Sequence, residues 1–295
     1  MIDLIDFDIS IRERMENIRL KANDDSNAKT FCSCYMWAKP MNIKLHLECD
    51  MYAVKNNSHG PSAWNFPVGG KKAKIDFIKR LAGIENLKLL KLSAQDVDFI
   101  NKYYPSVFVI EEATDDSEYI YDAIEHNEMS GKRFGGLRRL VNQFNRQHSI
   151  KTEMLKRYNM PMAEKVMMMW GAAHKARGEL STSGTEVDRF IIDHYDEIGM
   201  IGILIYIDGI PSAVVMGYPI SSDMCDIAEI KFIPTINNVG CIAVKEFMMS
   251  FGGTYRFFNY EEDMGIDGLR EHKQRLKPCR MNVLYNAYLK GVEKV

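Results

Sequence analysis

The chain of 295 residues is long enough for one large domain or two of ordinary size, and its 46% hydrophobic and 26% charged residues are typical of a soluble globular protein. The longest apolar run, at 198–207, has ten residues and excludes a membrane span, which needs about 20. The formal net charge of −2 decides neither for nor against a polyanionic partner, because local charge asymmetry matters more than the sum.

The first half of the chain alternates predicted helices and strands. Apolar residues at helical spacing predict helices at 11–21 and 74–83, and Ser93 is expected to cap a helix at 94–103, with Asp96 as a favourable acid in its first turn. Strands are expected at 43–54 (a pair), 64–68, 87–92 and 107–111. This alternation predicts a mixed α/β layer.

The segment 131–157 carries a strong local positive charge, because eight basic residues stand against one acidic residue, a net charge of +7. Leu137, Val141 and Phe144 form an apolar helical stripe, and the polar residues of the same helix face elsewhere. The residues that we assign here to donor binding are Lys132, Arg133, Arg138, Arg139 and Asn142. Such a face fits a tRNA acceptor stem, a phospholipid head group or a nucleotide; the alternative is an ordinary solvated helix face.

The second half of the chain repeats the α/β theme. Helices are expected at 161–178, 186–195, 239–251 and 265–272, and strands at 200–207, 210–218, 226–232, 255–259 and 280–285. The Asp208-Gly209 dipeptide between the first two of these strands predicts a tight antiparallel hairpin. Strands, a central helix and then strand, helix and strand is the order of an acetyltransferase-type fold.

The six cysteines do not predict a metal site, because none forms a CxxC pair and the close pair Cys32 and Cys34 has no companion pair. Met1 leads into acidic residues and not into a signal peptide, so we expect reduced thiols and a cytoplasmic protein. Cys241 stands near the start of the helix at 239–251. We interpret it as a small packing residue, and the alternative is a reactive thiol.

The segment 257–278 has a composition that is poor for a core and suitable for a ligand site. A strand leads into an acidic turn that contains Glu261 and Asp263, and a basic helix follows. Glycines in this segment allow the backbone to bend or to approach a ligand closely. The residues that we assign here to ligand binding are Asn259, Gly265, Gly268, Arg270 and Lys273. Acids followed by a basic helix suit a ligand that carries an amine together with a phosphate or carboxylate.

Two long motifs carry a family resemblance. The run 257–278 (FFNYEEDMGIDGLREHKQRLKP) and the run 119–144 (YIYDAIEHNEMSGKRFGGLRRLVNQF) resemble the closing motif and a second signature of the phosphatidylglycerol lysyltransferase C-terminal domain family. The resemblance implies two tandem GNAT-like (acyl-CoA N-acyltransferase-like) domains with mixed sheets, related to aminoacyltransferases that use charged tRNA to build peptidoglycan bridges or to modify lipids. Tyr260, in place of a basic residue, and Arg275-Leu276, in place of a Ser-Tyr pair, are departures that bear on the substrate and not on the fold.

The resemblance, together with the predicted elements, implies a division of the chain into three parts. We expect an N-terminal GNAT-like domain at 1–127, basic linker helices packed between the two lobes at 128–185, and a C-terminal GNAT-like domain with the signature motif at 186–295.

Three carboxylates are the predicted catalytic residues. Glu261 and Asp263 would take the proton of the acceptor or hold its ammonium, and the alternative is that they are favourable charges at a helix N-terminus. Glu229, which alternates with apolar neighbours, points into the cleft as a further acid or faces solvent on an edge, and the sequence favours neither. We expect the acidic turn and the basic helix to form two halves of one ligand clamp. Alanine at Asp263 or Arg270 is then expected to abolish transfer with little loss of stability.

The expected function is acyl transfer from an activated donor to an amine or hydroxyl, with aminoacyl-tRNA as the favoured donor and no tightly bound cofactor. Acetyl-CoA is an alternative donor, although the stretch 237–243 keeps one glycine and no basic residue of the phosphate loop expected of acetyl-CoA enzymes. A further alternative is a non-catalytic module that binds an anionic ligand or partner on the same scaffold. Peripheral contact with a membrane stays open, and the sequence does not identify the acceptor.

Overall fold

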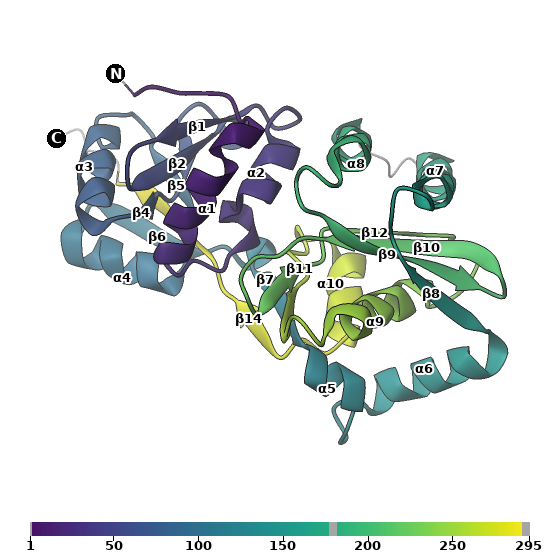
Figure 1. The fold of residues 1–295 in the computed structure, drawn as a ribbon. Helices are drawn as coiled ribbons and strands as arrows, with labels where there is room; N and C mark the ends of the chain where they lie inside the picture. Colours follow the sequence, from purple (N-terminus) through teal and green to yellow (C-terminus); the bar gives the residue numbers. More distant parts are fainter. Residues whose placement is uncertain (1, 177–181, 291–295) are drawn as a thin grey trace. The chain divides into compact units, whose positions relative to one another are not determined.

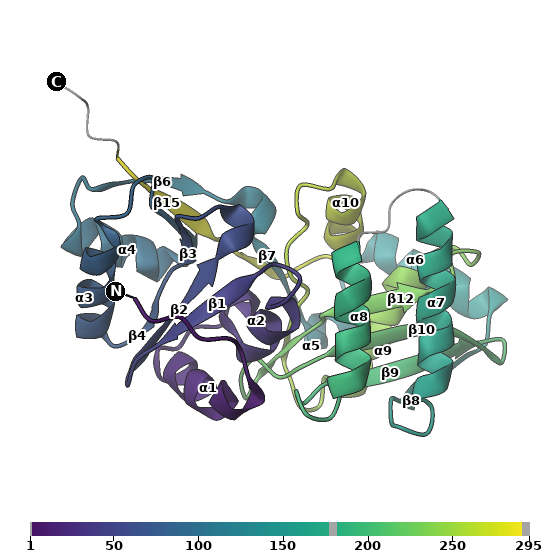
Figure 2. The same cartoon turned by 90° about the horizontal axis from the view of Figure 1, so that it is seen from above.

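The computed structural model describes residues 2–176 and 182–290, and for 182–184 the backbone alone. The chain divides into two compact units (Figure 1, and from above in Figure 2). The first unit consists of Met1–Glu118 and Asn282–Val295, and the second unit consists of Tyr119–Met281. The first unit is therefore discontinuous in sequence, because the end of the chain returns to it.

The first unit is built on one mixed sheet. Its strands run in the order β1-β2-β3-β5-β15-β6, with β4 also paired to β2, and β3 and β5 pair in parallel. The strands are β1 (Ile43–Leu47), β2 (Met51–Asn56), β3 (Ala63–Asn65), β4 (Val68–Gly69), β5 (Lys88–Leu92), β6 (Phe108–Glu112) and β15 (Tyr285–Leu289). The helices are α1 (Arg12–Lys21), α2 (Phe31–Trp37), α3 (Lys71–Leu81) and α4 (Ala94–Tyr103).

Both faces of this sheet are buried. Along β2, Met51 and Ala53 belong to a hydrophobic cluster that α3 and α4 complete, whereas Tyr52 and Val54 belong to a second cluster that α1 and α2 complete. Because side chains alternate along a strand, helices must cover both faces to bury both sets. This explains why every residue of β2 is buried.

The second unit contains two four-stranded sheets, in the orders β12-β10-β9-β8 and β11-β13-β7-β14. The strands are β7 (Glu118–Asp122), β8 (Ile150–Met154), β9 (Ile201–Ile207), β10 (Ile210–Gly217), β11 (Met224–Asp226), β12 (Glu229–Phe232), β13 (Phe257–Asn259) and β14 (Arg280–Asn282). The helices are α5 (Ala123–Glu128), α6 (Gly135–Gln147), α7 (Met160–Ala176), α8 (Thr182–His194), α9 (Val239–Phe251) and α10 (Asp267–Arg275). Within the described parts of the chain, no helix has the length and hydropathy needed to cross a membrane.

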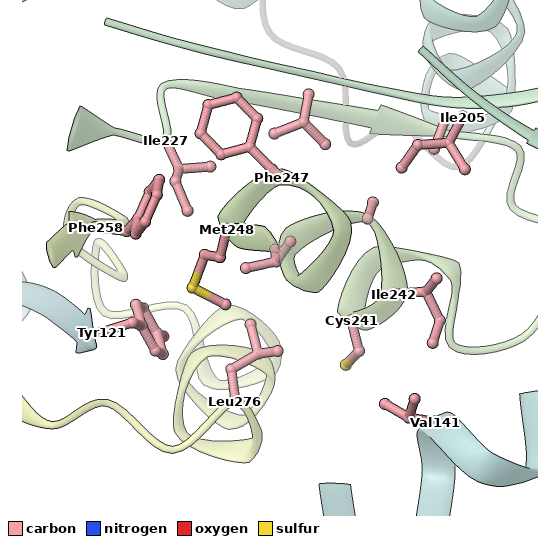
Figure 3. Packing of buried hydrophobic residues seen from close by; sticks show 14 of the residues in the cluster. Tyr121, Val141, Ile205, Ile227, Cys241, Ile242, Phe247, Met248, Phe258 and Leu276 are labelled. Atoms are coloured by element: carbon pink, nitrogen blue, oxygen red, sulfur yellow. The ribbon is translucent and has the colours of Figure 1, made fainter. Parts of the chain in front are cut away.

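Helix α9 forms the centre of the core of the second unit. Its residues 239–244 are all buried, as expected for a helix that is apolar on every side. Figure 3 shows Tyr121 beside Met248 of α9, and Val141 of α6 beside Ile242. Helices α7 and α8 lie on the opposite face of the sheet β12-β10-β9-β8 (Figure 1), so this sheet is covered on both sides.

Elements with strong local signals form where the sequence predicts them. Helices α4 and α9 match the predicted ranges, and Ser93 caps α4 through reciprocal hydrogen bonds with Asp96. Strands β7, β8 and β15 have no counterpart among the predicted elements, and the predicted helix at 265–272 begins at Asp267 and ends at Arg275. The predicted strand at 280–285 contains β14 but reaches only the first residue of β15, and these two strands belong to different sheets.

The compact units do not follow the predicted domain boundaries. The described residues of 128–185 belong to the second unit, where α6 contributes to the same core as α9; residues 177–181 lie outside the described part of the chain. The last residues also leave the predicted C-terminal domain, because β15 pairs with β5 and β6 of the first unit. Such pairing joins residues that are far apart in sequence, so no local pattern announces it.

Candidate functional site

One segment of the second unit passes from one sheet to the other. Asp226, the last residue of β11, pairs with Asn259 of β13, and the N–H of Ile227 donates to the carbonyl of Asn259 at 2.7 Å. Two residues later, Glu229 begins β12 opposite Met216 of β10. After Asp226 the chain therefore leaves β13 and joins the other sheet as β12, so β12 and β13 diverge from this point. The side chains that follow this point come from both strands, and they include the predicted acids.

The acidic turn that follows β13 has a strained backbone. Glu261 and Met264 have φ values of +53° and +54°, in the left-handed region that side chains other than glycine rarely adopt, and Gly265 follows at +71°. The side-chain oxygen of Asn259 accepts a hydrogen bond from the N–H of Glu261 at 2.8 Å. The surrounding contacts must hold this turn, because its conformation costs free energy.

Asp263 supplies several of those contacts. Its carboxylate accepts two hydrogen bonds from Arg270, from Nε at 2.8 Å and from Nη2 at 2.9 Å. The Tyr119 hydroxyl donates at 2.6 Å, and the N–H of Gly265 donates at 2.9 Å. The bond to Arg270 is the main cause that lowers the pKa of Asp263, to about 2. Asp263 is therefore ionised and fully hydrogen-bonded inside the protein, an arrangement that fixes the turn.

Lys273 supports the same turn from α10. Its ammonium is buried, donates to the carbonyl of Tyr260 and to that of Glu262 at 2.6 Å, and lies 4.3 Å from the centre of the Tyr260 ring. Burial lowers the pKa of Lys273. The sequence assigned Arg270 and Lys273 to a ligand, and the structure engages both with the acidic turn. Gly265 and Gly268 lie at the exposed surface of this segment.

Glu261 is the predicted acid with the chemistry of a proton carrier. Its side chain is half-buried, and its pKa is raised well above 4.5, first by burial and then by the charges of Asp226 and Glu262. Lys273 opposes this shift. A carboxyl group that keeps its proton toward neutral pH can exchange it with a substrate.

Glu229 is tied into a buried cluster that the sequence analysis missed. Its carboxylate lies 2.8 Å from Nζ of Lys231, which also lies 3.2 Å from Asp188 and 4.1 Å from the centre of the Trp170 ring. Burial and the charge of Glu229 raise the pKa of Asp188 to about 6. Glu229 and Lys231 are two residues apart in a strand, so their side chains lie on the same face of the sheet. This spacing is the feature of the sequence that could have predicted their ion pair.

The basic helix α6 exposes the predicted polar face. A cavity of about 420 Å³ lies on it, lined by Gly135, Arg138, Arg139, Asn142, Gln143 and Arg146. Arg138 is half-buried and donates to the carbonyls of Met129 and Gly131, whereas Arg139 is exposed. Since α6 alone lines this cavity, the cavity is not shared with the acidic turn, as the predicted two halves of one ligand clamp would require.

The remaining predicted donor-binding residues precede α6. Lys132 is exposed, and Arg133 forms an ion pair with Glu125 at 2.8 Å. Arg133 also donates to the carbonyls of Lys277 and Pro278, so it joins the start of α6 to the end of the C-terminal motif.

Cys241 lies 3.7 Å from Nδ1 of His272, a neighbour that the sequence could not reveal. Burial raises the pKa of Cys241 to about 11 and lowers the pKa of His272 to about 4, so both groups are neutral near pH 7. A side chain at the adjacent Gly240 would approach the rings of Phe232 and His272 within 3.0 and 3.2 Å. The start of α9 is therefore closely packed at this point.

Iodoacetamide at a pH of about 8 should label the exposed Cys49 well before Cys241, because alkylation needs an accessible thiolate. Peptide mapping by mass spectrometry over a time course measures both rates. Equal rates for the two cysteines would show that Cys241 is a reactive thiol.

The fold defines the class of protein. Its two units with mixed sheets have the tandem GNAT-like fold that the sequence motifs implied. The chain belongs to the family described as phosphatidylglycerol lysyltransferase, C-terminal, whose model matches residues 23–288.

Solved structures show the same fold. The chain is similar to a conserved protein of unknown function from Bacteroides thetaiotaomicron VPI-5482, with a TM-score of 0.89 and 20% identity over 98% of this chain and 100% of that chain. It is also similar to L-PGS from Bacillus licheniformis (TM-score 0.64, 14% identity, 95% and 92% covered) and to FemX (TM-score 0.61, 7% identity, 98% and 97% covered). A search of the curated proteins found no match. Family and fold relate the chain to acyltransferases in general.

Proposed function

We propose that this protein transfers an acyl group, with an aminoacyl group on tRNA as the favoured donor, to an amine or hydroxyl acceptor. The observation that carries the proposal is Glu261, a half-buried acid with a raised pKa at the point where β12 and β13 part, in a chain of this family. The charged tRNA donor implies a cytoplasmic location.

The reaction assigns Glu261 a proton-transfer role. The acceptor nitrogen or oxygen attacks the carbonyl carbon of the aminoacyl ester and loses a proton to the ionised Glu261. The new C–N or C–O bond forms, the ester C–O bond to the donor breaks, and the proton passes to the leaving hydroxyl. A raised pKa makes the Glu261 carboxylate a stronger base than an ordinary glutamate. Asp263, Arg270 and Lys273 hold the turn that positions it.

Transfer assays test this proposal directly. The purified chain is incubated with radiolabelled aminoacyl-tRNA, and separately with radiolabelled acetyl-CoA, together with soluble amines or phosphatidylglycerol vesicles as acceptors. We expect label in the acceptor with aminoacyl-tRNA. Transfer from acetyl-CoA alone would identify an acetyltransferase instead.

A non-catalytic module that binds an anionic ligand is the second candidate. The observation that favours it is that Asp263, Arg270 and Lys273 all bind within the motif itself. Tight tRNA binding without turnover of either donor would support this candidate over the enzyme.

The basic face of α6 should contribute the sequence-independent part of donor binding. Replacing Arg139 and Arg146 with glutamine removes two exposed charges and should lower the slope of log affinity against log salt by about 1–2, because fewer counterions are released. Fluorescence anisotropy with labelled tRNA across a salt series measures this slope. The control pair Lys165→Gln and Lys175→Gln removes two exposed charges from α7. If both pairs change the slope equally, α6 has no special role.

A further inference from the structure

The first unit contains a cavity that the acyl-transfer proposal does not use. It has a volume of about 330 Å³ and lies between the loop after α1, the region of β4 and the start of α4. This volume is at the small end of the range for small-molecule sites. All of its lining residues belong to the first unit.

One side of this cavity is suited to a carboxylate. The Lys74 ammonium lies 4.5 Å from the centre of the Phe99 ring and 3.6 Å from Oδ1 of Asp96, and its side chain is only 16% exposed. Ala94 and Gln95, the first residues of α4, line the cavity beside it. The N–H groups of a first helical turn have no acceptor within the helix, and the positive end of the helix dipole adds to the charge of Lys74.

The acidic residues of the lining are suited to an ammonium. Asp24 and Asp25 line the cavity from the loop after α1. The buried Lys29, which is not part of the lining, lies 2.7 Å from Asp24 and 2.8 Å from Asp96. It therefore holds the carboxylates of Asp24 and Asp96 in place and offsets one of their two charges. Carboxylates held in this way can receive a cation without first being ordered.

The balance of charges selects the ligand class. The lining itself offers charges of both signs: three carboxylates (Asp24, Asp25 and Asp96) and the Lys74 ammonium, while Lys29 offsets a further charge of Asp24 and Asp96. A phosphate would meet repulsion from the acids, and a simple amine would meet Lys74. A molecule with one carboxylate and one ammonium satisfies charges of both signs, and Phe99 offers an apolar surface for a side chain.

We propose that this cavity binds a free L-α-amino acid, with its carboxylate at Lys74 and the start of α4 and its ammonium at Asp24 and Asp25. Burial lowers the pKa of Lys74, and a bound carboxylate would favour its charged form. The site lies outside the acyl-transfer machinery, so the two proposals stand or fall separately.

Calorimetric titration of the full chain with each standard L-amino acid tests the proposal. At least one of them should bind saturably. The amide and the N-acetyl derivative of that amino acid lack the carboxylate and the ammonium respectively, and each should bind at least about tenfold more weakly. Inorganic phosphate and simple primary amines should not bind. Equal affinity for the derivatives, or no binding of any amino acid, would overturn the proposal with the wild-type protein alone.

Matched variants locate the site. Lys74→Gln should weaken binding by about tenfold or more, whereas Lys72→Gln, which changes an exposed lysine of the same helix, should leave it unchanged. Circular dichroism checks that both variants are folded. Equal weakening by the two variants would overturn the proposal. Weakening by Glu261→Gln without any effect of Lys74→Gln would place the amino acid in the second unit and would overturn it too.

Discussion

Replacing Glu261 with glutamine should lower the rate of acyl transfer by about 10²–10⁴-fold, because the amide has the shape of the acid but cannot take the acceptor's proton. The same change removes a charge that Asp226 and Glu262 repel, so the variant should be as stable as the wild type or more stable. Single-turnover transfer with the donor found in the assay above measures the first effect, and thermal unfolding measures the second.

The stability of this variant should also depend on pH in a defined direction. The pKa of Glu261 is raised in the folded protein above its ordinary value of 4.5, so the folded state binds the proton more tightly than the unfolded state does. The wild type therefore loses stability as the pH rises above about 4.5, and the variant lacks this loss. The difference in Tm between Glu261→Gln and the wild type should grow from pH about 4.5 toward neutrality.

A matched substitution separates this effect from a general change of charge. Glu271→Gln removes an exposed carboxylate of α10, and its Tm difference from the wild type should stay small across the same pH range. If the two variants follow the same pH profile, the pKa of Glu261 is not raised. If Glu261→Gln keeps full transfer activity, the proton leaves the acceptor by another route.

Local signals explain which parts of the fold the sequence predicts. Helix α4 carries the Ser93 capping box, and α6 carries the apolar stripe of Leu137, Val141 and Phe144, all of which are buried as expected. Strand β7 has no such signal, because it is short, buried along its whole length and bounded by the charged Glu118 and Asp122. It forms by pairing with β13 and β14, which lie far away in sequence.

In the candidate site, too, the sequence predicts the residues of one motif but not their partners from distant parts of the chain. The motif identifies Asp263, Arg270 and Lys273, and their spacing predicts a charged surface for a ligand. The structure turns these side chains inward, where Arg270 binds Asp263 and Lys273 binds the carbonyls of the turn. Tyr119, which completes the contacts of Asp263, lies 144 residues away. No spacing within the motif could reveal that partner.

Replacing Asp263 with asparagine should destabilise the second unit by about 2–3 kcal/mol, because it removes the buried negative charge that accepts hydrogen bonds from the partly exposed Arg270 and from Tyr119. The sequence alone predicted the opposite, a loss of activity with little loss of stability. Thermal and denaturant unfolding measure the change. Asp267→Asn removes an exposed carboxylate from the first turn of the same helix and should cost less than about 1 kcal/mol.

Lowering the pH should reduce the difference in unfolding free energy between the wild type and Asp263→Asn. The pKa of Asp263 is about 2 in the folded protein against an ordinary value of 3.8, so its stabilisation is present above pH about 4 and is lost as the pH falls toward 2. The shift corresponds to about 2 kcal/mol, and the two proteins should approach each other in stability by about that amount over this range. A variant that keeps wild-type stability but loses transfer would mean that Asp263 meets the substrate, and the structural role assigned to its pair with Arg270 would be wrong.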